Sequence, residues 1–136
     1  MRNILALSSI IYMSCISNHE YVSDLLLFGQ WESSGENYIM ELIFTDDNKF
    51  ELKFKNIDEN FFIYYKGDYK VNNSIIPNTI DLKKIDNHSG PLYSIIKKID
   101  ENTFQIAALS NKLKLRPIAF KKNNSILFHR KIKREI

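Results

Sequence analysis

Charged and apolar side chains alternate without interruption in Lys49-Phe50-Glu51-Leu52-Lys53-Phe54-Lys55. Neighbouring side chains of a β-strand point to opposite faces, so we expect this segment to form a strand with one apolar and one charged face. The same spacing occurs shortly before it in Met40, Leu42 and Phe44, and residues 46–48 are of the types that form tight turns. The sequence therefore predicts a β-hairpin over residues 38–55.

Period-two spacing recurs in further segments along the chain. Their apolar positions are Ile63, Tyr65, Tyr69 and Val71; Ile80 and Leu82; Tyr93 and Ile95; Phe104, Ile106 and Ala108; Leu113 and Leu115; Ile126 and Phe128. Gly67 falls within the first of these segments and predicts a bulge or a bend. About eight short strands separated by polar turns, with no long helices between them, predict an all-β antiparallel barrel or sandwich. Before the strands, the helical spacing of apolar residues in 21–28 predicts one short helix.

Cys15, the only cysteine, ends a segment that is typical of a secretory signal. Arg2 is followed by an apolar run over residues 4–13 and by the small residue Ser14, just before the cysteine. A lone cysteine at this place predicts a bacterial lipoprotein, in which the thiol of Cys15 carries the lipid that anchors the protein in a membrane. Two alternatives stay open: plain secretion with an unmodified cysteine, and a free cysteine buried at the start of an ordinary apolar helix.

This prediction divides the chain into three parts. They are a signal peptide over residues 1–14, a lipidated anchor and tether over 15–20, and one domain over 21–136. We expect the protein in the bacterial cell envelope and, because Ser17 rather than Asp follows Cys15 by two residues, common sorting rules favour the outer membrane. The domain has no further cysteine, so hydrophobic burial and not a disulfide is expected to hold it together.

Composition and motifs argue against several functional classes. The formal net charge of +3 is too small for a domain that binds nucleic acid. His19, His88 and His129 are far apart in the sequence, so we expect no metal site. The chain has four glycines and neither a glycine-rich phosphate loop nor a Gly-x-Ser-x-Gly turn, so we expect neither a cofactor nor an enzyme.

Four short motifs occur in order along the chain: Leu27-Phe28-Gly29-Gln30-Trp31, Pro77-Asn78-Thr79-Ile80-Asp81-Leu82, Gly90-Pro91-Leu92-Tyr93 and Arg116-Pro117-Ile118-Ala119-Phe120. In this order and spacing they resemble the motifs of a bacterial family of small lipocalin-like domains of unknown function. The resemblance covers most of residues 27–120. It implies a small up-and-down antiparallel barrel of about eight strands, in proteins that are commonly secreted or lipid-anchored, and it carries over no catalytic residues.

The resemblance also implies a device that closes one end of the barrel. Trp31, next but one to Gly29, seals this end, and the guanidinium of an arginine from a late strand lies over its ring. By position in the motifs we expect this arginine to be Arg116, with Arg130 as the alternative. Asp81, between two apolar residues, is expected to point outward or to pair with a Lys or Arg at the rim.

Five aromatic residues are candidates for lining the interior: Phe50, Phe54, Tyr65, Tyr69 and Tyr93. They border an apolar cavity if the barrel is hollow and form the core if it is filled. A hollow barrel predicts a lipid-anchored lipoprotein that binds a small apolar ligand. A filled barrel predicts a module that binds or inhibits another envelope protein through its loops, with an apolar patch at Ile57, Phe61 and Phe62.

Overall fold

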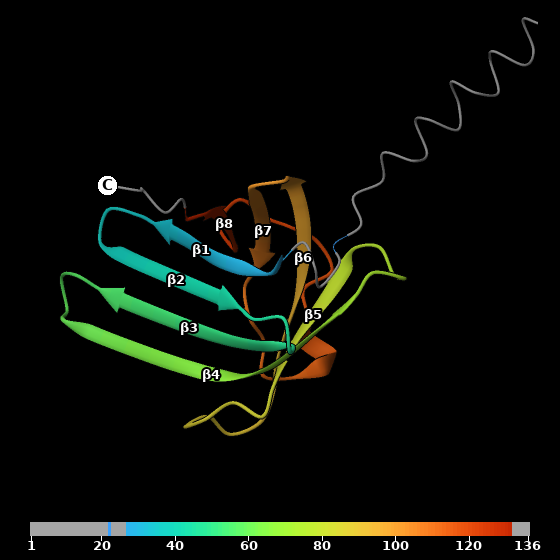
Figure 1. Ribbon diagram of the computed structural model, residues 1–136, viewed down its shortest axis with the longest axis horizontal. Coiled ribbons are helices and arrows are strands. Elements are labelled where there is room, and N and C mark those ends of the chain that lie inside the picture. The colour runs from blue at the N-terminus through green and yellow to red at the C-terminus, as the bar shows by residue number, and fades with distance from the viewer. Residues whose placement is uncertain (1–21, 23–26, 132–136) are drawn as a thin grey trace, which may run out of the picture.

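The computed structural model describes residue 22 and residues 27–131. They form a closed barrel of eight strands, in which each strand pairs with the next and β8 pairs with β1, all antiparallel (Figure 1). The strands are β1 (Gly29–Ser34), β2 (Tyr38–Phe44), β3 (Lys49–Asn56), β4 (Phe61–Asn72), β5 (Asn78–Lys83), β6 (Leu92–Asp100), β7 (Thr103–Ala107) and β8 (Ser125–Arg130). The predicted all-β antiparallel barrel is confirmed. Within the described ranges, no helix has the length and apolar composition needed to cross a membrane.

Several predictions concern residues outside these ranges. They are the signal peptide over residues 1–14, the lipid attachment at Cys15, the tether and most of the helix over 21–28. Two described residues of the last segment, Val22 and Leu27, are buried, with 1% and 2% of their surface exposed, and belong to the barrel core. The segment before β1 therefore contributes these two side chains to the core of the barrel.

The predicted hairpin over residues 38–55 is confirmed. β2 and β3 pair throughout their length, from Phe44 opposite Phe50 to Tyr38 opposite Asn56. In the turn between them Asn48 has a φ of 64°, in the left-handed region that asparagine tolerates better than most residues. The alternation of the sequence thus places one apolar face of the hairpin against the interior.

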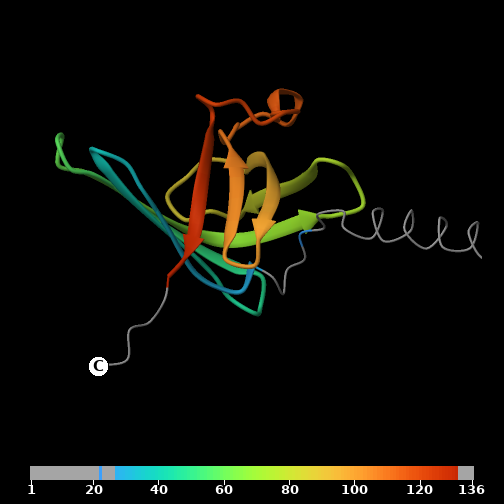
Figure 2. The same cartoon turned by 90° about the horizontal axis from the view of Figure 1, so that it is seen from above.

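β4 changes its partner near Gly67. Residues 61–68 pair with β3, whereas residues 68–72 pair with β5. A Cβ atom on Gly67 would lie 2.5 Å from the carbonyl oxygen of Lys83 and 2.8 Å from that of Lys84, so glycine is what lets the two backbones approach. The first half of β4 has a strand on one side only, and the sheet β1–β4 flares away from the other strands (Figure 2).

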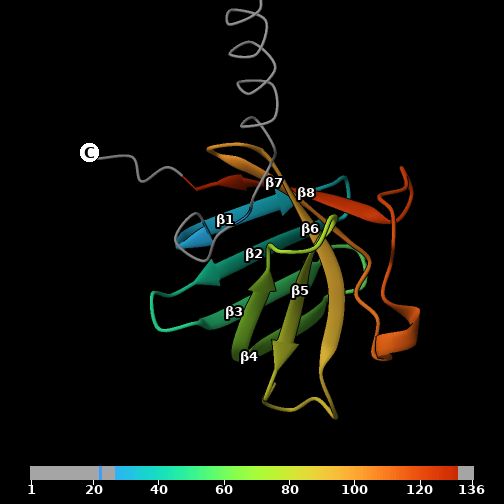
Figure 3. The same ribbon diagram turned by 90° about the vertical axis from the view of Figure 1, so that its right-hand side faces the viewer.

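The segment between β7 and β8 lies outside the barrel, beside β6 (Figure 3). Here the prediction of a strand is wrong: the 3₁₀ turn η1 (Leu113–Leu115) replaces it, with Leu113 60% and Leu115 65% exposed. Two leucines at alternate positions do not define a strand when no neighbouring strand supplies the backbone hydrogen bonds. A bridge between Ser110 and Tyr93 attaches the segment to β6.

Candidate ligand-binding site

One end of the barrel is filled around Trp31. This side chain is 2% exposed, its Nε1 donates a hydrogen bond of 2.8 Å to the carbonyl oxygen of Leu27, and its ring meets that of Phe104 edge-on with 4.5 Å between centroids. The guanidinium carbon of Arg130 lies 4.2 Å from the centroid of the Trp31 ring, and its Nη1 donates a hydrogen bond of 2.9 Å to the carbonyl oxygen of Phe28. A cation–π contact of this kind stabilises by roughly 0.5–2 kcal/mol. This plugged end leaves no room for a ligand.

The closing arginine is Arg130, and the prediction of Arg116 is wrong. Trp31 and Arg130 lie directly opposite each other where β1 pairs with β8, so their side chains share one face of the sheet. A Cβ atom on Gly29, which has a φ of +127°, would lie 2.8 Å from Nη1 of Arg130, so the glycine leaves space for the guanidinium. Arg116 lies after η1, outside the barrel, where it cannot reach the Trp31 ring.

Arg116 instead fastens the outer segment to β5 and β6. Its Nη2 donates a hydrogen bond of 2.6 Å to the carboxylate of Asp81, and its Nη1 donates one of 2.9 Å to the carbonyl oxygen of Ser94. Its guanidinium carbon lies 5.0 Å from the centroid of the Tyr93 ring. The expectation that Asp81 pairs with an arginine is confirmed, and these contacts serve to attach the segment.

The interior contains an apolar cavity of about 100 Å³. Its walls are Met40, Leu42, Phe44, Leu52, Ile80, Leu82, Ile106, Ala107, Ala108, Leu109, Ile126 and Phe128. The cavity runs from the buried Phe44 and Phe128 to the half-buried Met40 and to Leu109, which is 39% exposed, at the end away from Trp31. Ligand sites usually occupy about 300–1,000 Å³, so this cavity holds only part of a ligand.

Beyond the cavity, the inner face of the flared sheet is apolar and half-buried. We call this surface the shelf; it consists of Tyr38, Met40, Phe54, Ile63 and Tyr65. Strand pairing places Met40, Phe54 and Ile63 in one row across β2, β3 and β4. The rings of Tyr38 and Phe54 stack with 6.0 Å between centroids. Because Met40 also borders the cavity, the shelf continues the cavity wall toward solvent.

The five predicted lining residues occupy three different environments. Phe50 and Tyr69 are core residues, 1% and 4% exposed. Phe54 and Tyr65 lie on the shelf, and none of the five borders the cavity itself. Tyr93 lies on the outer face of β6 beneath a guanidinium, so its predicted inward orientation is wrong. The reason is register: the residues on either side of Tyr93 belong to the inner face, and a shift of one residue exchanges the faces.

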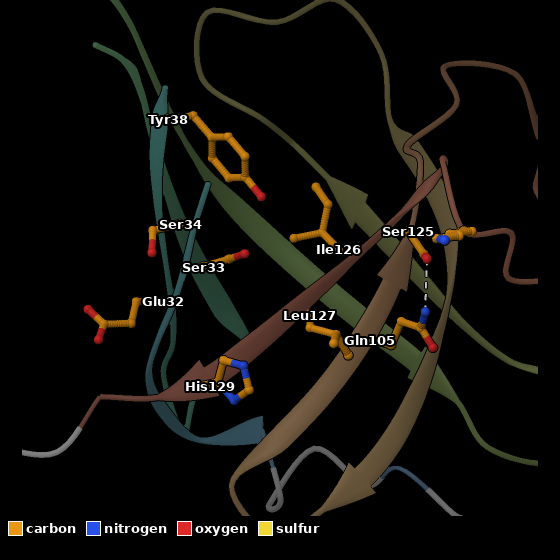
Figure 4. A pocket seen from close by; sticks show the side chains of 10 residues that line it. Glu32, Ser33, Ser34, Tyr38, Gln105, Ser125, Ile126, Leu127 and His129 are labelled. Carbon is orange, nitrogen blue, oxygen red and sulfur yellow. Dashed lines mark hydrogen bonds between the residues drawn. The ribbon is translucent and has the colours of Figure 1, made fainter. Parts of the chain in front are cut away.

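β1 and β8 separate beyond two paired positions and leave a slot in the barrel wall (Figure 4). The slot has a volume of about 640 Å³ and is lined by Glu32, Ser33, Ser34, Tyr38, Gln105, Lys122, Ser125, Ile126, Leu127 and His129. Ser33, Tyr38 and Ile126 are directed into the space between the strands, whereas Glu32 is directed away from it. Ile126 also borders the cavity, so the slot adjoins the interior.

The sequence pattern does not identify Ser33 and Tyr38 as site residues. The alternation of a strand does indicate that Ser33 faces inward, because it follows the inward-facing Trp31 by two positions and shares its face. The separation of β1 from β8, which turns a core position into a site position, has no local signal in the sequence.

A second, polar groove of about 570 Å³ is lined in part by Gly67, at the point where β4 changes its partner, which we call the bend. In it Nζ of Lys49 lies 2.5 Å from the carboxylate of Asp68; this hydrogen bond lowers the pKa of Asp68 and raises the pKa of Lys49. Nearby, the hydroxyl of Tyr64 donates a hydrogen bond to Glu51, which raises the pKa of Tyr64. Both pairs are solvent-exposed and combine opposite charges or polar groups, so they favour neither an anionic nor a cationic ligand.

Comparison with protein-family models, with curated proteins and with solved structures yields no match for this chain. The geometry alone therefore defines the class: an eight-stranded antiparallel barrel, plugged at one end by Trp31, with an apolar cavity of about 100 Å³ toward the other.

Proposed function

We propose that this chain is a binding domain for a small apolar ligand, which the cavity and the shelf hold together. The observation that carries the proposal is the continuous apolar surface from the cavity, through Met40, onto the half-buried side chains of β2, β3 and β4. In a filled barrel whose sheet did not flare, these side chains would be covered. Here they are partly exposed next to a cavity without a polar lining residue.

The dimensions favour a chain-like ligand. The cavity of about 100 Å³ accepts one apolar end, and the shelf supports the rest along its length. Each methylene group that leaves water stabilises the complex by about 0.8 kcal/mol before the entropic cost of binding. A compact rigid ligand would gain less, because it contacts only the mouth of the cavity.

We further propose that the protein is a lipoprotein of the bacterial cell envelope, anchored through the lipidated Cys15. Cys15 precedes the buried Val22 by seven positions, a span of at most about 25 Å of extended chain. Val22 and Leu27 lie at the plugged end, beside Trp31, so an anchor at Cys15 would place this end nearest the membrane and the cavity farther from it. Labelling with a fatty-acid analogue in the wild type and in Cys15→Ser tests the anchor.

Native mass spectrometry of the chain purified without denaturation tests ligand binding. We expect a reproducible additional mass that disappears on denaturation. Met40→Trp fills the junction of cavity and shelf and should abolish the additional mass, whereas Ile39→Trp, at an exposed position on the same strand, should retain it. A bare mass in every preparation, together with no binding of the apolar dye Nile red, would contradict the proposal.

The alternative function is a module that binds another envelope protein. It is favoured by one observation, the exposure of Ile57, Phe61 and Phe62 by 50%, 50% and 61% around the turn between β3 and β4. Large exposed apolar side chains that lie close together mark interaction surfaces. Replacing Phe62 by Ser would remove such an interaction and leave the binding of small ligands unchanged.

A further inference from the structure

Ser33 is a buried residue whose hydroxyl group opens onto a pocket. The residue is 7% exposed and borders the slot between β1 and β8, and its side chain is directed into this slot (Figure 4). Within the described ranges the Ser33 hydroxyl makes no hydrogen bond. The polar groups of buried residues are normally hydrogen-bonded, so a hydroxyl that faces a pocket instead of a protein group is available to a partner from outside the chain.

Tyr38 presents a second hydroxyl to the same space. Its ring stacks on Phe54 at the edge of the shelf, and its hydroxyl also has no hydrogen-bond partner among the described residues. Gly35 fixes this arrangement, because a Cβ atom at this position would collide with the ring of Tyr38. The ring thus lies on the shelf while its polar end is directed into the slot.

The two hydroxyls lie where the polar slot meets the apolar surface. Ser33 is directly opposite Met40, which borders the cavity, and Ile126 borders both the cavity and the slot. A molecule whose apolar part occupies the cavity therefore brings its end group to Ser33 and Tyr38. We propose, on the basis of the proposed function, that the ligand is amphipathic, with an uncharged hydrogen-bonding head group bound by these two hydroxyls.

The charges around the slot favour an uncharged head group over an ion. Of the residues that border the slot, Glu32 carries a negative and Lys122 a positive formal charge, and these two charges cancel. The guanidinium of Arg130 is held over the Trp31 ring and by a backbone carbonyl oxygen at the plugged end. A carboxylate bound at Ser33 would lose water without gaining a buried cation, which opposes its binding.

Displacement of Nile red from the full chain tests this inference, with octan-1-ol and 1-chlorooctane as ligands of equal chain length. The variant Ser33→Ala/Tyr38→Phe removes two hydroxyl oxygen atoms and keeps the carbon atoms of both side chains, so the packing stays nearly the same. It should raise the Kd of octan-1-ol about tenfold, as the loss of two neutral hydrogen bonds predicts, and leave the Kd of 1-chlorooctane within about twofold. The control Ser89→Ala/Tyr64→Phe changes one exposed serine and one exposed tyrosine that border neither the slot nor the cavity, and it should alter neither value.

The possible outcomes test the head-group site and the apolar ligand site separately. If both octyl compounds displace Nile red and the double variant binds octan-1-ol as the wild type does, the head-group site is wrong and the apolar site stands. If octanoate binds at least tenfold more tightly than octan-1-ol, the head group is charged and the inference is overturned. If the chain binds neither Nile red nor the octyl compounds, the proposed function itself fails.

Discussion

The two ends of this barrel use the same kinds of side chain for opposite purposes. At the plugged end, Trp31 and Phe104 are 2% exposed and their rings are in edge-to-face contact. At the open end, Tyr38 and Phe54 are half-buried, and their stacked rings face the slot and the shelf. Aromatic content therefore does not distinguish core from site; the distance along each strand from the plug does.

The strongest test of this difference uses two phenylalanines on the same face of β3. Phe50 is 1% exposed, whereas Phe54 lies on the shelf. Phe50→Ala should lower the free energy of unfolding by about 3–5 kcal/mol, because it leaves a cavity in a packed core. Phe54→Ala should lower it by about 1 kcal/mol, because solvent already reaches the ring. Urea unfolding measures both values.

For ligand binding we expect the opposite order, with the larger effect from Phe54→Ala. Phe54→Ala removes part of the shelf and should weaken the displacement of Nile red by octan-1-ol, although the protein stays folded. If Phe54→Ala is as destabilising as Phe50→Ala, the shelf is part of the core and the open end is filled.

At Gly67 the strand β4 passes from pairing with β3 to pairing with β5, so the next largest effect is expected at this residue. Gly67→Ala places a methyl group 2.5 Å from the carbonyl oxygen of Lys83, and the backbone of β4 or β5 must move. We expect a loss of about 1–3 kcal/mol in the free energy of unfolding, as in other overpacked sites. Gly90→Ala is the control: no atom lies within 4 Å of its Cβ position, so only its φ of +82° opposes the change. Equal losses in the two variants would show that no close contact fixes the bend.

The sequence predicted the strands well where each strand has one apolar and one polar face. β3 and β5 show strict alternation, because one face contacts the interior and the other contacts water. β6 breaks this rule: Ser94, Ile95 and Ile96 are all buried, since the outer segment covers the outer face. Ile95 is therefore an apolar residue on the outer face of β6, and Tyr93, two positions before it, shares that face. For this reason the alternation of these two residues predicts the wrong face.

The site could be predicted less well than the fold. Phe54 and Tyr65 were found because they continue an alternating strand on its apolar side. Motif position favours Arg116 over Arg130, because it does not specify which strand closes the barrel on β1. The slot arises where β1 and β8 stop pairing, a non-local event that depends on the curvature of both strands.

The plug offers a smaller and more specific test, since Trp31 is the only tryptophan. Arg130→Met removes the guanidinium above its ring and the hydrogen bond to the carbonyl oxygen of Phe28. The emission spectrum of Trp31 should change, and the free energy of unfolding should fall by about 1–2 kcal/mol. Arg116→Met should leave the emission unchanged. A spectral change in Arg116→Met alone would restore Arg116 as the closing residue.

The smallest effect is expected from the exposed pair at the bend. The hydrogen bond with Lys49 lowers the pKa of Asp68 below its ordinary 3.8 in the folded state, so this pair stabilises the fold above that pH and the contribution is lost as the pH falls. The same bond raises the pKa of Lys49 above its ordinary 10.5, so the contribution is also lost as the pH rises beyond that value.

Lys49→Met should therefore flatten the acid limb of the urea midpoint measured between about pH 5 and pH 2.5, and leave the shelf unaffected. Lys84, whose Nζ lies 3.8 Å from the carboxylate of Asp68, retains part of the effect, so Lys49→Met/Lys84→Met should flatten it further. Lys66→Met changes a third lysine of the groove and serves as the control. An acid limb that is equally steep in the double variant and in the wild type would assign the acid sensitivity to carboxylates away from the bend.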